Sequence, residues 1–441
     1  KNHIIIEMIE NEALPGWIKK QEPHVQREAA NSGFDKEETL ILPLTNKFGD
    51  IERIVARKGK KIRFYDMARI ADKLRQSFSV DLLKSTSFEI SGLTGKDLEN
   101  ACLSWLFAGY SFDVYKKRNL IPPVLLLPKE INKKQVQAIA EAAFLTRNLI
   151  NIPANDLGPD EIEACVSTLA EGYKASVKVV KGKPLEKNFP LIHTVGKASP
   201  RAPRLIELNW GDAKNPKLVL VGKGVVFDTG GLDIKPSQYM RLMKKDMGGA
   251  AHAIALAKII MELKLPVCLQ VLIPCVENAV GGAAFRPGDI IKSRKGLSVE
   301  NTNTDAEGRL ILADALAYGT EETPDLIIDF ATLTGSARAA LGQDIPAMFS
   351  NNDKVAKDLQ GIAFQEEDPL WQMPLWSDYE GLMESPDADL INSSGTPGDL
   401  IYSALFLQKF LNGSPDWVHL DLFAWETSGR PGRSKGGCEM G

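Results

Sequence analysis

The sequence predicts an α/β protein with a smaller N-terminal α/β domain and a larger C-terminal domain, in which helices cover both faces of a central mixed sheet. Three observations favour this fold. The chain has 441 residues, and at ~100–200 residues per domain it holds two or three domains. Strand-like apolar runs alternate with helix-like stretches in the C-terminal part. A helical stretch bounded by a proline separates the two parts.

We assign residues 1–131 to the N-terminal α/β domain, 132–152 to a connecting helix before Pro153, and 153–441 to the C-terminal domain. The chain begins at Lys rather than Met and ends after a glycine-rich stretch, so we expect both ends to be trimmed relative to the gene product.

The N-terminal domain mixes short apolar runs at 3–7 and 40–44 with helical periodicity over 70–78 and 98–110. A basic cluster also lies in this part. It consists of Arg53, Arg57, Lys58, Lys60, Lys61 and Arg63. We interpret the cluster as a solvated hairpin turn, and a nucleic-acid-binding patch is the alternative.

The C-terminal part contains candidate strands at 218–221, 267–273, 326–328 and 418–422. The candidate helices cover 247–263, 309–318 and 400–410. Such alternation predicts a sheet with helices on both faces, whose ligands bind beyond the carboxyl ends of the strands.

Composition excludes several classes of function. The formal net charge is -4, which gives no reason to expect a nucleic-acid or membrane surface. No apolar run reaches the ~18 residues of a transmembrane helix. The five cysteines form no CxxC pair, so we expect reduced thiols and a cytoplasmic protein.

The histidines limit the kind of metal site that is available. The chain has five histidines, and no two are spaced as ligands on one helix face. A metal site in this protein is therefore expected to use mainly oxygen ligands.

An apolar strand and a second apolar run carry the first candidate residues, in the segment LVLVGKGVVFDTGGLDIK over 218–235. The strand is followed by Lys223, the second run ends at Asp228, and Lys235 closes the segment. The glycines allow close approach of a ligand to the backbone. A phosphate-binding loop is not indicated, because Gly224 stands where that motif requires Ser or Thr.

Two further acidic segments precede predicted helices. Asp246 opens a small-residue helix, where an N-cap is the simpler interpretation. Asp305 and Glu307 are two residues apart, and in an extended stretch they would project to the same side, with Arg309 continuing the alternation. Capping of the following helix would explain one of these carboxylates, but it would not explain two carboxylates together with an arginine.

All four carboxylates fall at strand ends or helix starts of one predicted sheet. If they converge, they cannot all stay ionised without cations. Two divalent ions would balance the four negative charges, and ions such as Mn²⁺, Mg²⁺ or Zn²⁺ suit hard oxygen ligands. Four unrelated caps and surface acids are the alternative.

These segments together resemble the leucyl aminopeptidase (cytosol aminopeptidase) family. The string NTDAEGRL at 303–310 is similar to the family signature. GKGVVFDTGGLDIKP, MKKDMGGAA and ATLTG are similar to further family motifs in the same order. The resemblance runs from about residue 148 to the C-terminus, and the N-terminal third contains no motif that we could name.

The resemblance implies a metal-dependent aminopeptidase of peptide catabolism that acts through a water bridging two Zn²⁺ or Mn²⁺ ions. One ion is implied at Lys223, Asp228, Asp246 and Glu307. The second, exchangeable ion is implied at Asp228, Asp305 and Glu307. A lysine ligand must be neutral, so cations would have to lower its pKa strongly.

The resemblance also implies roles in catalysis and substrate binding. Lys235 would stabilise the developing oxyanion, Arg309 would hold a proton-shuttling bicarbonate, and Asp246 would bind the substrate α-amino group. Substrate-binding residues are implied at Met243, Asn303, Thr332, Leu333 and Gly335. Of these, Met243 and Thr332 would line a mostly apolar pocket for a first residue such as Leu. The stretch after Asp421 departs from many family members, so one pocket wall is not predicted.

The family assembles as a homohexamer, a dimer of trimers, and the resemblance implies the same assembly here. Peptides are the implied substrates, and neither a membrane nor nucleic acid is an implied partner. Two competing functions are a non-catalytic scaffold or DNA-binding regulator on the same fold, and a different two-metal hydrolase such as a phosphatase.

Overall fold

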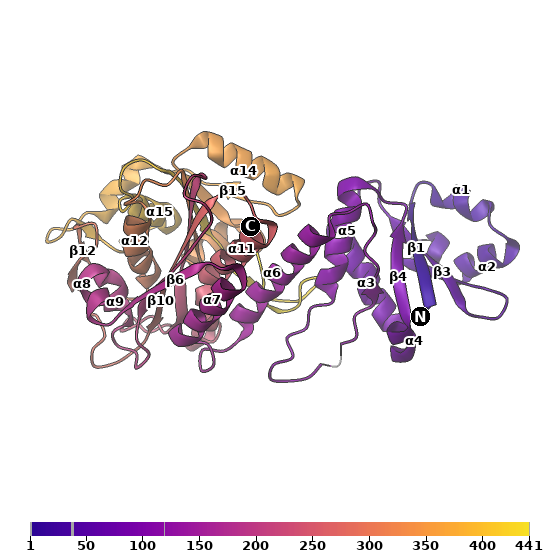
Figure 1. Cartoon of the computed structure of the whole chain (residues 1–441), viewed down its shortest axis with the longest axis horizontal. Helices are drawn as coiled ribbons and strands as arrows, with labels where there is room; N and C mark the ends of the chain where they lie inside the picture. The colour runs from indigo at the N-terminus through magenta and orange to yellow at the C-terminus, as the bar shows by residue number, and fades with distance from the viewer. Residues whose placement is uncertain (1, 37–38, 119, 441) are drawn as a thin grey trace. The chain divides into compact units, whose positions relative to one another are not determined.

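The computed structural model describes residues 2–36, 39–118 and 120–440 (Figure 1). By its internal contacts the chain forms two compact units. The first unit contains residues up to Glu141 together with Thr427–Lys435, and the second contains Ala142–Glu426 together with residues from Gly436 onward. The division falls inside the helix α6 (Lys133–Asn151), which occupies the place of the predicted connecting helix.

The first unit is the predicted small α/β domain, and its sheet has the strand order β2-β3-β1-β4-β5. Its elements are β1 (Asn2–Glu10), α1 (Leu14–Lys19), α2 (Pro23–Asn31), the 3-10 helix η1 (Phe34–Lys36), β2 (Ile41–Thr45), β3 (Ile51–Lys58), α3 (Asp66–Ser77), α4 (Val80–Ser85), β4 (Thr86–Ser91), α5 (Gly95–Ala108) and β5 (Val124–Leu125).

The interpretation of the basic cluster as a solvated hairpin turn is wrong for the residues that lie on a strand, whereas Lys60, Lys61 and Arg63 are exposed in the segment that follows it. Arg53, Arg57 and Lys58 lie on β3. Arg53 pairs with Glu7 at 3.1 Å and Lys58 pairs with Glu10 at 3.0 Å. The strand places these cations against carboxylates of the parallel neighbour β1, so part of the positive charge is neutralised within the sheet.

The second unit has a mixed sheet with the order β15-β14-β17-β13-β8-β10-β7-β6, and β9 pairs with β10. Its elements are α7 (Pro159–Tyr173), β6 (Ser176–Lys181), α8 (Lys183–Asn188), α9 (Pro190–Gly196), β7 (Arg204–Trp210), β8 (Lys217–Gly222), β9 (Gly224–Asp228), α10 (Ser237–Met240), the 3-10 helix η2 (Met243–Met247), α11 (Gly248–Leu263), β10 (Cys268–Asn278), β11 (Ile290–Lys292), β12 (Ser298–Glu300), α12 (Glu307–Gly319), β13 (Leu326–Ala331), α13 (Gly335–Leu341), β14 (Ala347–Ser350), α14 (Asp353–Gln365), β15 (Trp371–Gln372), the 3-10 helix η3 (Ser377–Met383), β16 (Leu390–Ile391), α15 (Asp399–Gln408), β17 (Asp416–Asp421), β18 (Trp425–Glu426) and β19 (Gly436–Gly437).

The four predicted strands of this part form the middle of the sheet as β17, β13, β8 and β10, which run parallel to one another. Figure 1 shows α8, α9, α12 and α15 on one side of the strands and α7, α11 and α14 on the other. One apolar core fills each face, because the strands are buried on both sides. The predicted mixed sheet with helices on both faces is therefore confirmed.

Asp314 anchors α12, the helix that begins with Glu307. Its buried carboxylate accepts backbone hydrogen bonds from Leu191 (2.8 Å) and Ile192 (3.4 Å) in the first turn of α9, and from Arg294 (2.8 Å). Burial raises the pKa of Asp314 to about 7, although these N–H donors act in the opposite direction.

We expect Asp314→Ala to lower the free energy of unfolding by about 2–4 kcal/mol, because buried N–H groups lose their acceptor. Asp314→Asn retains one oxygen acceptor and is expected to cost less. Urea titrations of both variants followed by circular dichroism measure the difference. Equal stability of the wild type and Asp314→Ala would contradict this anchoring role.

Candidate metal centre

Two strand ends deliver the first two predicted ligands. Lys223 follows the last residue of β8, and its backbone N–H bonds to the carbonyl oxygen of Phe330 on β13 at 2.9 Å. Asp228 is the last residue of β9, where it pairs with Asn278 of β10. Both side chains therefore leave the sheet at the carboxyl ends of parallel strands, as the sequence predicts.

Asp246 lies in η2, immediately before α11. Its side chain makes no capping hydrogen bond to the helix, so the N-cap alternative is wrong. Instead, one carboxylate oxygen accepts a 2.8 Å hydrogen bond from Thr332 Oγ1, and the other lies 2.7 Å from Lys223 Nζ. The carboxylate is thus turned toward the end of the sheet.

Asp305 and Glu307 converge, but not through the predicted extended geometry. Glu307 is the first residue of α12, and Asp305 lies in the turn before it. The turn is held by Asn303 Oδ1, which accepts a 2.8 Å hydrogen bond from Asp305 N. The predicted extension of the alternation to Arg309 is wrong, because that residue lies within the helix.

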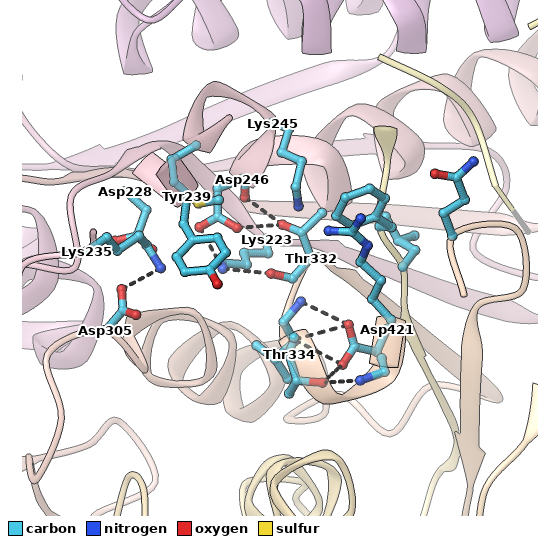
Figure 2. Close-up of a pocket in the computed structure, with 18 of the residues that line it drawn as sticks. Lys223, Asp228, Lys235, Tyr239, Lys245, Asp246, Asp305, Thr332, Thr334 and Asp421 are labelled. Carbon is cyan, nitrogen blue, oxygen red and sulfur yellow. Dashed lines mark hydrogen bonds and ion pairs between the residues drawn. The ribbon is translucent and has the colours of Figure 1, made fainter. Parts of the chain in front are cut away.

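The four carboxylates, here called the acid cluster (Asp228, Asp246, Asp305 and Glu307), surround two lysines. Lys223 Nζ lies 3.1 Å from Glu307 Oε1 in addition to its contact with Asp246. Lys235 Nζ lies 2.9 Å from Asp228 Oδ2 and 2.5 Å from Asp305 Oδ1. Figure 2 shows Lys235 and Asp305 pointing at each other across the site.

The site is almost closed to solvent at its base. Lys223, Asp228, Asp246 and Glu307 are each 3% exposed or less. Gly308 leaves space for Lys223, because a Cβ at position 308 would lie 2.5 Å from Lys223 Cε and the lysine side chain would have to shift. The glycine of the 303–310 segment therefore makes room for the lysine that reaches the acid cluster.

Charge and unused acceptors show that the residues fit divalent cations. Four carboxylates face two ammonium groups, which leaves an excess of negative charge in a buried site. Both oxygens of Glu307 are buried and accept no hydrogen bond from the described residues. Ligand atoms of Asp228, Asp305 and Glu307 lie within 4.8 Å of one another. This oxygen-rich donor set suits hard divalent ions.

The pKa shifts follow the same crowding. Burial and the neighbouring Asp228 raise the pKa of Asp305 to about 6, and they raise the pKa of Glu307 well above its usual range. Burial alone would lower the pKa of Lys223, but Asp246 and Glu307 outweigh burial and raise it. Without metal, the lysines neutralise part of the acid cluster.

Metal affinity is expected to increase as pH rises from about 5 to about 7, because bound protons compete with the metal. Asp305 is protonated below its raised pKa, about 6, and Lys223 must lose a proton before its nitrogen can act as a ligand. Each displaced proton gives about a tenfold increase in affinity per pH unit. Calorimetric titration with Mn²⁺ in buffers of different ionisation enthalpy counts these protons. A pH-independent affinity without proton release would contradict this competition.

The acid cluster opens into a cavity of about 500 Å³. Met243, Thr332, Leu333 and Gly335 line it, as predicted for pocket residues. Asn303 is not among the lining residues and supports the turn at Asp305 instead.

The Arg309 guanidinium contacts two partners on another segment. One guanidinium nitrogen donates to the carbonyl oxygen of Asn392 at 2.7 Å, and another donates to Asp399 Oδ1 at 2.9 Å. Its Nε is buried and has no acceptor among the described residues.

Sequence reasoning missed two residues that matter to the site. Asn278 is buried at the end of β10, and its amide donates to Asp228 Oδ1 at 2.8 Å and to Thr304 O at 3.1 Å. It thereby joins the loop of Asp305 to the strand of Asp228. Lys245 also lines the cavity, and its only signal in the sequence is its position beside Asp246.

Comparisons with known proteins agree with this geometry. Residues 144–439 match the family model described as the catalytic domain of the cytosol aminopeptidase family, and residues 4–128 match the N-terminal domain model of M17 aminopeptidases. A probable cytosol aminopeptidase of Syntrophotalea carbinolica is 41% identical over 355 residues, which cover 76% of this chain and 71% of that protein.

Solved structures extend the similarity over the whole chain. The crystal structure of a cytosol aminopeptidase from Coxiella burnetii is 42% identical, covers 100% of this chain and 95% of its own, and has a TM-score of 0.93. The bottromycin maturation enzyme BotP in complex with Mn is 28% identical, covers 99% of this chain and 96% of its own, and has a TM-score of 0.87. None of the helices in the described residues has the length and apolar character needed to cross a bilayer.

Proposed function

The chain belongs to the cytosol aminopeptidase family and is a metal-dependent aminopeptidase, and we propose that the acid cluster holds its two divalent cations. Lys223, Asp228, Asp246 and Glu307 hold one ion, and Asp228, Asp305 and Glu307 hold the other. The observation that carries this assignment is the excess negative charge of four converging carboxylates at the base of the cavity.

Zn²⁺ and Mn²⁺ are the proposed metals, because both accept carboxylate oxygens. The similar BotP structure in complex with Mn supports the use of Mn²⁺. When bound, the two ions would supply positive charge that polarises a peptide carbonyl and acidifies a water molecule.

The residues of the chain then orient and stabilise the substrate. Asp246 accepts hydrogen bonds from the α-amino group of the peptide, which explains a requirement for a free N-terminus. Lys235 lies beside Asp228 and Asp305, and its ammonium stabilises the negative charge that develops on the carbonyl oxygen. We assign Arg309 to holding a bicarbonate that transfers the proton, and the buried Nε without an acceptor supports that assignment.

The first residue of the peptide is proposed to be apolar, with Leu as the representative. Met243 and Leu333 contribute apolar surface to the cavity, and Thr332, which also lines it, donates a hydrogen bond to Asp246. A cavity of about 500 Å³ is large enough for a leucine side chain and the start of the next residue.

The family supports two further proposals, a homohexamer built as a dimer of trimers and a place in the cytoplasm. The relatives are named as probable cytosol aminopeptidases, which supports the second. Multi-angle light scattering tests the assembly, and a stable monomer would overturn it.

The direct test of the proposed function is hydrolysis of Leu-p-nitroanilide by the protein loaded with Mn²⁺ or Zn²⁺. We expect turnover that stops with a chelator and returns with added metal. Folded, metal-loaded protein that releases no p-nitroaniline with either ion would overturn the proposal. Faster hydrolysis of p-nitrophenyl phosphate would identify a different two-metal hydrolase.

A further inference from the structure

The cavity contains a lysine that the proposed chemistry does not use. Lys245 is 7% exposed and lines the cavity, and Figure 2 shows its side chain reaching in among the lining residues. Its ammonium donates no hydrogen bond and makes no ion pair among the described residues. It lies over the ring of Phe423, with Nζ 4.6 Å from the ring centroid. A largely buried charge without a partner is costly, so a ligand anion would find an uncompensated cation here.

Arg338 of α13 provides a second cation on the same aromatic ring. The guanidinium carbon lies 4.2 Å from the Phe423 centroid, and Arg338 also lines the cavity. This guanidinium makes no ion pair or side-chain hydrogen bond within the described parts of the chain. The ring holds both cations by cation–π attraction, which orients them without neutralising their charge.

The nearby carboxylates are already occupied. Both oxygens of Asp421 accept hydrogen bonds from Thr334, and one also accepts a 3.0 Å bond from Leu333 N. Asp246, the sequence neighbour of Lys245, contacts Thr332 and Lys223. Unlike Lys223 and Lys235, the two cations on Phe423 form no ion pair with a carboxylate of the described residues.

We propose that Lys245 and Arg338, held on Phe423, form a binding subsite for a carboxylate of the substrate. The proposal rests on the proposed aminopeptidase function and specifies the substrate class that the cavity favours. The carboxylate can come from an acidic side chain at the first residue or from the C-terminus of a short peptide. Arginine and lysine both form charge-assisted hydrogen bonds with such a group.

Two matched pairs of substrates separate these sources. Glu-p-nitroanilide and Gln-p-nitroanilide differ in charge at the first side chain. The dipeptide Leu-Gly and its amide Leu-Gly-NH₂ differ in charge at the C-terminus. We expect the charged member of one pair to have a kcat/KM about tenfold higher, because a charged hydrogen bond at a shielded site contributes that much.

Variants then assign the preference to the subsite. Lys245→Met and Arg338→Met are each expected to reduce the charged-to-neutral ratio of that pair to about a third or less. Lys244→Met is the matched control. This variant removes the same charge one residue away. The Lys244 ammonium donates a hydrogen bond to Asn151 O at 2.6 Å, and the residue does not line the cavity. Its ratio is expected to equal that of the wild type.

Each outcome decides the proposal. A ratio near one in both pairs, with Leu-p-nitroanilide hydrolysed normally, overturns the subsite and leaves the aminopeptidase assignment intact. A preference that survives in both cavity variants also overturns it. If the metal-loaded protein hydrolyses none of the compounds, the aminopeptidase assignment fails. The same four compounds then bind without being cleaved. Calorimetric Kd ratios of the charged and neutral compounds, in the wild type and the variants, then test the proposed subsite.

Discussion

Glu307→Gln is expected to weaken binding of divalent metal by at least about a hundredfold, since even changes to residues around metal ligands cost 10–100-fold. Glu307 is the most deeply buried member of the acid cluster, and apart from the Lys223 ammonium 3.1 Å from Oε1, its oxygens have no donor among the described residues. At metal concentrations that saturate the wild type, kcat is expected to fall on the order of a thousandfold, which corresponds to several kcal/mol of lost charge stabilisation. Metal analysis after gel filtration and assays with Leu-p-nitroanilide measure the two effects.

In the metal-free protein, the same variant is expected to increase the stability of the fold. The pKa of Glu307 is raised in the folded protein. Its contribution to stability is therefore present at low pH and is lost as pH rises through the folded-state pKa. A neutral glutamine removes that loss, and we expect Tm in the presence of a chelator at pH 8 to rise by about 2 °C.

Glu207→Gln, in β7 of the same unit, provides a matched control. Glu207 is also buried, but it accepts hydrogen bonds from Gln270 at 2.8 Å and Tyr318 at 2.8 Å. Although burial acts to raise the pKa of Glu207, these donors and Asn209 outweigh it and lower the pKa. We expect this variant to lose stability and keep its metal. Full metal occupancy in Glu307→Gln, or its loss in both variants, would contradict the assigned site.

Lys235→Ala is expected to lower kcat by about 10²–10³-fold, the usual effect of removing a donor to a developing oxyanion. KM for Leu-p-nitroanilide is expected to change little, because the interaction forms in the transition state. Steady-state kinetics at saturating Mn²⁺ provide both constants.

Metal binding separates this role from a structural one. In the metal-free protein Lys235 pairs with Asp228 and Asp305, so its ammonium competes with cations for these carboxylates. We therefore expect Lys235→Ala to bind Mn²⁺ as tightly as the wild type or more tightly. Activity and metal lost together would show that the lysine maintains the site rather than stabilises charge in the reaction.

Much of the fold was predictable because its signals are local. Each central strand of the larger unit is a short apolar run that is buried on both faces, and α11, α12 and α15 lie where apolar stretches predicted helices. The interpretation of 51–63 failed in part because charged residues on β3 pair with Glu7 and Glu10 of a strand far away in the sequence.

The site shows the same division between local and distant information. By itself, the sequence determined that acids stand at the end of β9 and at the starts of α11 and α12, since these positions depend on chain order. Only the tertiary structure decided which way the side chains turn. Arg309 turns to Asn392 and Asp399, and Lys245 turns into the cavity. The physical reason is that a side chain takes its direction from the local backbone and from partners brought close by folding, and residues dozens of positions apart carry no mutual signal in one sequence.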